Sequence, residues 1–283
     1  MRLIKTIDEM REVRKATRKS GQRLGLVPTM GALHEGHLSL VRAAREKSDI
    51  VAVSIFVNPT QFGPNEDFAK YPRNLENDSK MLERDQVDVI FAPSVDDMYP
   101  ADAVTWVTVE GMSDRLCGRS RPGHFRGVTT VVAKLFHIIE PDVAFFGQKD
   151  AAQITIIRRM VRDLNMPVEI GVGAIVRESD GLALSSRNAY LDPQERKSAL
   201  VLHRSLQSAA QLFQRGERNS ESLIAAGKQE FANLPNARLD YFEIVDPNSL
   251  EPLATISNRA LIAVAAFIGN TRLIDNVIVD PGR

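Results

Sequence analysis

Cysteine, aromatic residues and net charge are all scarce in this chain of 283 residues. It has one cysteine, one tryptophan and 6% aromatic residues, and its 36 basic side chains are balanced by 36 acidic ones. The single Cys117 excludes an internal disulfide framework and is typical of a reducing compartment, where we expect it to be a packed thiol. A net charge of zero argues against a chain-wide basic field for nucleic acid or for an acidic membrane.

Long hydrophobic runs are missing as well. The longest, Ala260–Ile268, is far shorter than the roughly 20 residues of a membrane-spanning helix. Residues 1–6 lack the apolar core of a signal peptide, so the sequence predicts a cytoplasmic protein with no membrane or nucleic-acid partner. With 43% hydrophobic and 25% charged residues, the composition is typical of a globular chain with one large or two modest domains.

The first two thirds of the chain alternate between buried-strand and helix patterns. Strands are expected at 24–27, 50–57, 87–93, 143–146 and 168–176, and helices at 75–85, 128–139 and 151–164. This alternation predicts an α/β fold, a Rossmann-like doubly wound parallel sheet with helices on both faces. Ligands of such sheets bind beyond the carboxyl ends of the strands.

The pattern changes near residue 177. Helices are expected at 193–215 and 220–233, followed by strands at 239–245, 261–267 and 273–279. We therefore predict two domains: a Rossmann-like nucleotide- and substrate-binding domain over residues 1–177, and a second, smaller α+β C-terminal domain over residues 178–283. A hinge around 178–187 would let the second domain act as a lid.

The most informative motif follows the strand at 24–27. Residues 28–41 read Pro-Thr-Met-Gly-Ala-Leu-His-Glu-Gly-His-Leu-Ser-Leu-Val, which puts His34 and His37 at the start of an amphipathic helix. Unpaired N–H groups and the positive end of the helix dipole gather there, so phosphate is the natural ligand. The histidines could instead be surface residues or zinc ligands, but no nearby Cys or carboxylate cluster completes a zinc site.

Polar groups also follow two other predicted strands. Asn58 and Gln61 come after 50–57, and their uncharged amides suit a small polyhydroxy acid better than a phosphate. Gly147-Gln148-Lys149-Asp150 comes after 143–146 and offers a lysine for phosphate, with Gln153 one helical turn farther.

Two loops complete the polar sets. Residues 184–188, Leu-Ser-Ser-Arg-Asn, supply hydroxyls and a guanidinium suited to the terminal phosphates of a nucleotide. The Gly-rich basic loop 118–127 is either a lid over an anion or a solvated loop. Several phosphate-suited sets on one α/β frame indicate nucleotide chemistry.

In order and spacing, these motifs resemble those of the pantothenate synthetase (pantoate–β-alanine ligase) family. The resemblance covers nearly the whole chain and rests on segments 28–37, 58–62, 147–150 and 184–188. His-Glu-Gly-His resembles the His-x-Gly-His signature of a larger nucleotidyltransferase superfamily that includes class I aminoacyl-tRNA synthetases. Those relatives carry a lysine-rich loop where this chain has Ser185-Ser186-Arg187, which must act through hydroxyls and Arg187.

The resemblance implies an ATP-dependent ligase of pantothenate and coenzyme A biosynthesis, acting in two steps. The carboxylate of (R)-pantoate attacks the α-phosphorus of ATP, with Mg²⁺ present, giving pantoyl adenylate and pyrophosphate. The amine of β-alanine then attacks the adenylate, giving pantothenate and AMP. Without a protein nucleophile, catalysis reduces to positioning and charge neutralisation. The resemblance also implies a homodimer.

The same resemblance implies roles for individual residues. His37, His34 and Lys149 are the implied catalytic residues, with His37 as proton donor and Lys149 on phosphate. The implied pantoate contacts are Gln61 and Gln153, with Gln61 also near β-alanine. Asp78 is expected to assist Mg²⁺, which phosphates and water would otherwise hold. The implied ATP-binding residues are Met30, Gly31, Ala32, Leu33, His34, Glu35, Gly36, His37, Gly147, Gln148, Lys149, Asp150 (ribose), Val176 (adenine), Leu184, Ser185, Ser186 and Arg187 (β- and γ-phosphates).

Three other interpretations fit parts of the pattern. A nucleotidyltransferase that moves AMP or CMP onto a phosphate-bearing acceptor would keep the fold, although the uncharged Gln61 and Gln153 argue against such an acceptor. A non-catalytic nucleotide sensor would bind ATP without cleaving it between the α- and β-phosphates. A zinc hydrolase would use the histidines as ligands and would copurify with zinc.

Overall fold

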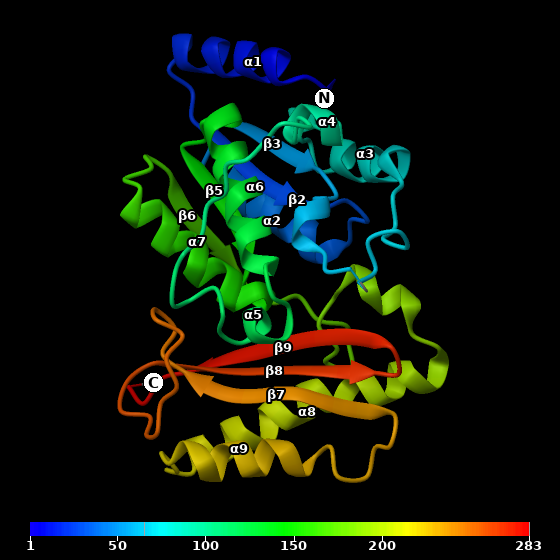
Figure 1. Ribbon diagram of the computed structural model, residues 1–283, viewed down its shortest axis with the longest axis vertical. Helices are drawn as coiled ribbons and strands as arrows, with labels where there is room; N and C mark the ends of the chain where they lie inside the picture. Colours follow the sequence, from blue (N-terminus) through cyan, green and yellow to red (C-terminus); the bar gives the residue numbers. More distant parts are fainter. Residues whose placement is uncertain (65, 283) are drawn as a thin grey trace. The chain divides into compact units, whose positions relative to one another are not determined.

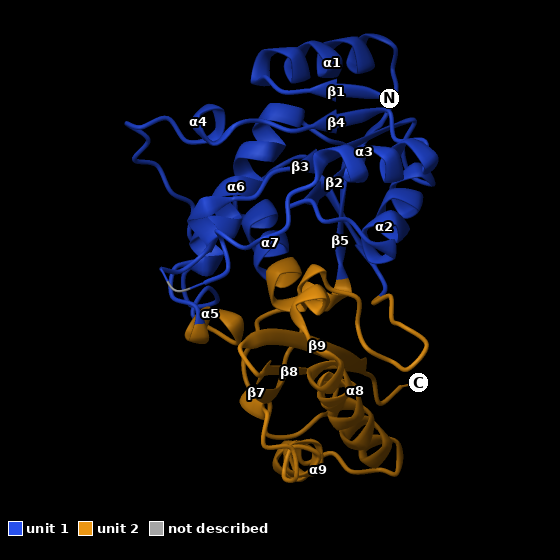
Figure 2. Ribbon diagram, turned by 90° about the vertical axis from the view of Figure 1, so that its right-hand side faces the viewer, with its two compact units in different colours: residues 1–114, 121–147, 156–174 blue, residues 115–120, 148–155, 175–283 orange. Residues whose placement is uncertain are grey.

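The computed structural model describes residues 1–64 and 66–282. The chain forms two compact units: unit 1 comprises Met1–Asp114, Arg121–Gly147 and Ile156–Ala174, and unit 2 comprises Arg115–Ser120, Gln148–Thr155 and Ile175–Arg283 (Figure 2). The predicted division into folding domains between residues 177 and 178 stays a prediction.

Unit 1 is built on a six-stranded sheet with the order β1-β4-β3-β2-β5-β6 (Figure 1). Its strands are β1 (Arg2–Ile4), β2 (Leu24–Thr29), β3 (Ile50–Ile55), β4 (Val89–Phe91), β5 (Val143–Gly147) and β6 (Glu169–Gly173). All the strand pairs are parallel, and from β2 the order runs outward through β3 and β4 on one side and β5 and β6 on the other, with β1 at the edge beside β4. The predicted Rossmann-like doubly wound sheet is confirmed.

The register brings the carboxyl ends of the strands to one edge of the sheet. Thr29 at the end of β2 pairs with Ile55 at the end of β3, and the last residues of β5 and β6, Gly147 and Gly173, pair with each other. The strand order reverses between β2 and β5, and such a switch point is where doubly wound sheets bind ligands. The segments that leave β2 and β5 are therefore the first place to look for a site.

Helices cover this sheet. Their bounds are α1 (Ile7–Lys19), α2 (Glu35–Arg45), α3 (Leu75–Arg84), α4 (Val95–Met98), α6 (His124–Ile139) and α7 (Ala151–Asp163). The part of α7 from Ile156 onward belongs to unit 1. α2 packs on β2, β3 and β5 because Leu38, Val41 and Ala44, three residues apart, form one buried apolar face. α1 packs beside α6.

Unit 2 contains a three-stranded antiparallel sheet, β7-β8-β9, formed by β7 (Ala237–Val245), β8 (Ala260–Ile268) and β9 (Thr271–Val279). Figure 1 shows these strands side by side with α8 (Pro193–Gln214) and α9 (Ser220–Gln229) packed against them. The short helices α5 (Cys117–Ser120), η2 (Gln148–Asp150) and η3 (Ser186–Tyr190) also belong to this unit, as do the first residues of α7 up to Thr155. The predicted smaller α+β part of the fold is confirmed.

The core of unit 2 lies between the sheet and the two long helices. Leu202 and Leu206 of α8 pack with Ile262 and Val264 of β8, all 2% exposed or less. In the part of the chain that the structure describes, no helix is long and apolar enough to cross a membrane.

Candidate functional site

The predicted site residues divide between the two units. Unit 1 holds Met30–His37, Gln61, Asp78 and Gly147. Unit 2 holds Gln148, Lys149, Asp150, Gln153, Val176 and Leu184–Arg187.

Two histidines build the start of α2. His34 is the N-cap residue, with extended backbone, and its Nδ1 accepts a hydrogen bond from the N–H of Gly36 at 3.2 Å. The backbone N–H of His34 donates in turn to Nδ1 of His37 at 3.3 Å, and the ring centroids lie 4.1 Å apart. This is a capping box in which imidazoles replace the usual hydroxyl and carboxylate.

The cap determines which nitrogen carries the proton in each neutral ring. Because Nδ1 of both His34 and His37 accepts from a backbone N–H, the neutral imidazole carries its proton on Nε2. Two Nε2–H donors therefore stand at a helix N-terminus, where the backbone dipole favours an anion. A zinc site needs three or four ligands, and no group of three or more His, Cys, Asp or Glu that could hold a metal occurs among residues 1–64 and 66–282.

Asp78 anchors the turn that precedes this helix. Its side chain is buried on the first turn of α3, and its two carboxylate oxygens accept the N–H groups of Ala32 and Leu33 at 3.0 and 2.9 Å. Burial raises the pKa of the Asp78 carboxyl, and the two N–H groups oppose that rise. The turn needs an anchor because Gly31 and Ala32 both have left-handed backbone, with φ of 81° and 50°.

Magnesium prefers an octahedral shell of oxygen ligands. Each oxygen of Asp78 already accepts a backbone hydrogen bond, and the described residues contain no cluster of three carboxylates or other metal-binding side chains around it. These residues do not amount to a resident magnesium site. The role of Asp78 toward Mg²⁺ stays a prediction.

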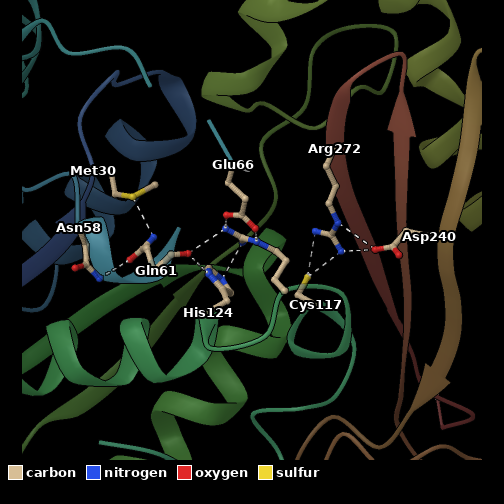
Figure 3. A network of polar contacts seen from close by, with 9 residues as sticks. Met30, Asn58, Gln61, Glu66, Cys117, His124, Asp240 and Arg272 are labelled. Carbon is tan, nitrogen blue, oxygen red and sulfur yellow. Dashed lines mark hydrogen bonds and ion pairs between the residues drawn. The ribbon is translucent and has the colours of Figure 1, made fainter. Parts of the chain in front are cut away.

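Asn58 orients the side chain of Gln61 (Figure 3). The Nδ2 of Asn58, a residue only 1% exposed, donates to Oε1 of Gln61 at 3.0 Å and to the carbonyl of Gly127 at 3.1 Å. Since its amide oxygen is held in this way, Gln61 turns its Nε2 toward Met30, whose sulfur lies 3.0 Å away. The structure thus brings Gln61 to the turn that carries the histidines.

The backbone of Gln61 is held by the basic loop. Its carbonyl accepts from Nδ1 of His124 at 2.9 Å and from Arg121 at 3.2 Å. Arg121 also forms two hydrogen bonds to Glu66, at 2.7 and 2.5 Å. Burial raises the pKa of the Glu66 carboxyl, but Arg121 outweighs burial and leaves that pKa below its ordinary value. Arg121 and His124, expected on a loop that closes over an anion or is solvated, instead buttress a predicted substrate contact.

In unit 2, a hairpin joins two of the predicted nucleotide segments. The N–H of Leu184 donates to the carbonyl of Val176 at 3.0 Å, and Arg177 pairs with Ala183 in an antiparallel bridge. The Oγ of Ser185 accepts from the N–H of Arg187 at 3.3 Å and starts η3. Val176 and the loop that begins at Leu184 are therefore neighbours in space.

The other predicted residues of unit 2 lie along one stretch of chain. Gln148, Lys149 and Asp150 form η2, and Gln153 follows on the first turn of α7. The Nζ of Lys149 lies 3.8 Å from a carboxylate oxygen of Asp150, and the Lys149 side chain is 22% exposed. Lys149 is therefore a partly screened cation just beyond β5.

Comparison with known proteins shows similarity along nearly the whole chain. The family model of pantoate-beta-alanine ligase matches residues 2–278. The chain is 58% identical over 279 residues to the pantothenate synthetase of Koribacter versatilis, covering 99% of this chain and 96% of that protein. It is 56% identical over 280 residues to the pantothenate synthetase of Moorella thermoacetica, covering 99% of both.

Solved structures are similar as well. The crystal structure of pantothenate synthetase from Thermus thermophilus has a TM-score of 0.94 at 46% identity, with 99% of this chain and 100% of that chain covered. A pantoate-beta-alanine ligase from Francisella tularensis, complexed with beta-gamma ATP and beta-alanine, has a TM-score of 0.78 at 35% identity, with 98% and 97% covered.

Proposed function

Because the chain belongs to the pantoate-beta-alanine ligase family, we propose that it joins (R)-pantoate to β-alanine at the expense of ATP. Pantoyl adenylate is the intermediate, and the products are pantothenate, AMP and pyrophosphate. The observation that carries the proposal is the imidazole capping box at the carboxyl end of β2 in a chain of this family. The two imidazoles can donate hydrogen bonds to phosphate, and the proposed reaction needs no nucleophile from the protein.

In the first step, the pantoate carboxylate attacks the α-phosphorus of ATP. Negative charge grows on the phosphate oxygens, and the Nε2–H groups of His34 and His37, together with the start of α2, stabilise it. A ring whose Nδ1 accepts from the backbone cannot give up its Nε2 proton without becoming an imidazolate. We therefore propose that His37 acts as a hydrogen-bond donor to the transition state, and the proton-donor role that the resemblance implied stays a prediction.

The nucleotide residues of unit 2 have separate tasks in this proposal. Lys149 neutralises phosphate charge as a compact cation, and Asp150 accepts from the ribose hydroxyls. Val176 contacts the adenine, while the hydroxyls and guanidinium of Ser185–Arg187 hold the β- and γ-phosphates. The hydrogen bond from the N–H of Leu184 to the carbonyl of Val176 supports this assignment, because it holds the proposed adenine contact next to the start of the proposed phosphate-binding loop. ATP enters as its Mg²⁺ complex.

Pantoate is held by uncharged amides. Gln61 presents the nitrogen of an amide whose oxygen is already bonded to Asn58, so it donates to an oxygen of pantoate. Gln153 is the second pantoate contact. The amine of β-alanine then attacks the acyl carbon and AMP leaves, so the second step also needs only positioning.

The deciding experiment follows nucleotide and pyrophosphate in reactions of the purified chain with Mg-ATP and pantoate, with and without β-alanine. We expect AMP, pyrophosphate and pantothenate to accumulate over many turnovers only when all substrates are present. ADP formation, or ATP binding without cleavage, would contradict the adenylation mechanism. The second of these outcomes would favour a nucleotide sensor.

We also propose that the enzyme acts in the cytoplasm as a homodimer. The single cysteine, which is not in a disulfide, supports a reducing compartment, and the dimer rests on the family resemblance. Light scattering on the purified protein tests the oligomeric state, with a mass of twice 31.4 kDa expected.

Replacing Gln153 by alanine is expected to raise the KM for pantoate far more than the KM for ATP. The reason is that the amide contacts the acid and not the nucleotide. Initial rates of pyrophosphate release at varied pantoate and varied ATP give both constants. The matched control is Gln207→Ala, an exposed glutamine on α8, which should change neither. Equal effects on both substrates would argue against a pantoate contact.

Replacing Asp78 by asparagine separates its two assignments. Asparagine keeps one acceptor and turns an NH₂ toward the second backbone N–H, so we expect the free energy of unfolding to fall by about 1–3 kcal/mol. Adenylation should fall with it, because the turn of the histidines loses its anchor, and excess Mg²⁺ should not restore the rate. Restoration by excess Mg²⁺ would instead support the metal assignment. Asp85→Asn, at the other end of α3 and paired with Arg42 at 2.8 Å, is the control.

A further inference from the structure

Strand β9 carries two adjacent buried polar residues, Asp275 and Asn276, each 3% exposed. Along one edge β9 pairs with β8 over its whole length, and it also contacts η2 and η3. A buried carboxylate or amide costs free energy unless its hydrogen bonds are made. The partners of these two side chains are therefore informative.

Asn276 is bonded to the segment that contains Lys149. Its Nδ2 donates to the carbonyl oxygens of Gln148 and Lys149, at 2.9 and 3.0 Å. Its Oδ1 accepts from the side-chain Nε2 of Gln148 at 3.0 Å. One amide thus uses both N–H groups and its oxygen on two consecutive residues, and fixes the backbone from which the Lys149 side chain projects.

Asp275 is bonded to the hairpin 176–184. Its two carboxylate oxygens accept from the two terminal nitrogens of Arg177, at 2.6 and 2.9 Å. Such a paired geometry restricts both distance and orientation. The same guanidinium donates to the carbonyl of Gly181 at 3.0 Å, across the turn of the hairpin. Arg177 therefore ties the first strand of the hairpin and its turn to β9.

The two anchors are linked, because the N–H of Asn276 donates to Oδ1 of Asp275 at 2.7 Å. Neighbouring residues on β9 thus hold two segments, Gln148–Lys149 and the hairpin 176–184, which lie far from β9 in sequence. We propose that Asp275 and Asn276 are positioning residues for the nucleotide: they hold the Lys149 backbone and the loop 184–187 at a fixed spacing for the phosphates of ATP. This inference rests on the proposed function for the roles of those two segments, and neither residue of β9 is assigned a contact with ATP.

The test compares Asn276→Asp with a control from the same sheet. The substituted carboxylate has the size of the amide but turns oxygens toward the two carbonyls. Asp240→Asn is the control, because Asp240 on β7 accepts from Arg272 of β9 at 2.7 Å and from Ser120 at 2.9 Å, and both partners lie outside the two proposed nucleotide segments. ATP affinity is measured by calorimetry, and the KM for ATP and for pantoate by pyrophosphate release. Hydrogen exchange is measured over residues 146–153 and 176–187.

For Asn276→Asp we expect the KM and Kd for ATP to rise roughly tenfold to a hundredfold, as small misplacements of positioning groups do. Exchange should become faster in both segments, and the KM for pantoate should rise less than the KM for ATP, since Asn276 is bonded to Gln148 and Lys149 and not to Gln153, the proposed pantoate contact farther along the chain. Asp240→Asn should leave the ATP constants unchanged. Unchanged ATP constants in a folded Asn276→Asp protein, or equal losses in the control, would overturn the proposal.

If Asn276→Asp does not fold, Arg177→Lys decides in its place. It keeps the charge beside Asp275 but loses the paired geometry, and a larger rise in the KM for ATP than in the KM for pantoate is again expected. If the native protein binds ATP but forms no pantothenate, the proposed ligase function fails while the ATP affinities still decide the positioning role. If it binds no ATP, both fail.

Discussion

Replacing His37 by alanine is expected to leave a folded protein whose adenylation step is slower by at least tenfold and up to about 10³-fold, as for the loss of one preorganised donor. In the proposed mechanism the ring supplies the Nε2–H that stabilises charge on the reacting phosphate, and alanine supplies nothing in its place. Single-turnover release of pyrophosphate from Mg-ATP and pantoate measures the step. Circular dichroism and thermal unfolding verify the fold.

The alanine variant also removes the acceptor for the N–H of His34, so a second variant must separate the cap from the chemistry. His37→Asn is suited to this, because its amide oxygen can take the place of Nδ1 while nothing replaces Nε2. We expect near-native stability and a loss of rate as large as in the alanine variant. If asparagine restores the rate, the histidine acts only as a cap and its proposed role in adenylation is wrong.

Replacing Gly127 by alanine is expected to damage both stability and pantoate binding. A Cβ at this position of α6 would overlap the carbonyl oxygen of Thr60 and lie 2.6 and 2.7 Å from the carbonyl carbon of Thr60 and the nitrogen of Gln61. These are backbone atoms, so either α6 or η1 (Pro59–Gln61) must move. The hydrogen bond from Asn58 to the carbonyl of Gly127 would be strained as well.

Overpacking of this kind costs about 1–3 kcal/mol of stability, and chemical unfolding measures that loss. The displaced Gln61 should raise the KM for pantoate at least tenfold, in line with the effect of small misplacements, while the KM for ATP changes less. Gly63→Ala is the control, since its Cβ would meet nothing nearer than a carbon of Glu66 at 3.6 Å. A Gly127→Ala protein with native stability and native pantoate KM would show that α6 and η1 can separate without consequence.

The sheet of unit 1 could be predicted because its central strands are buried on both faces. Leu24–Val27 and Val51–Val53 are continuous apolar runs, and such runs identify parallel strands without any knowledge of partners. The first helix was not predicted, although Thr6 and Glu9 form a capping box before a pattern of buried residues. Helix α6 begins at His124, four residues before the prediction, because Gly123 with φ of 81° starts it.

The candidate site was predictable where its residues are close in sequence. His34 is the N-cap and His37 is the third residue of α2, the two positions that a capping box links. The three-residue spacing in the sequence is therefore the one that the mutual cap in the structure requires. Long-range partners left no local signal. Glu66 lies 55 residues from Arg121, and Asn276 lies 128 residues from Gln148. The basic loop 118–127 therefore had the pattern of an anion-binding loop, and nothing in the sequence was a reason to assign a role to Asp275 and Asn276.

Strand β9 follows, in the order of synthesis, every segment that it holds. Asp275 lies 98 residues after Arg177 and Asn276 lies 128 residues after Gln148, so the anchors do not exist until that length of chain has been translated. The parallel sheet of unit 1 has all its strands by residue 173, so it can collapse on the ribosome before β9 exists to bind the segments around Lys149 and Arg177. Chains released before residue 275 would then be folded in part yet poor at binding ATP, and a fusion that disturbs β9 would cost activity far from the point of attachment.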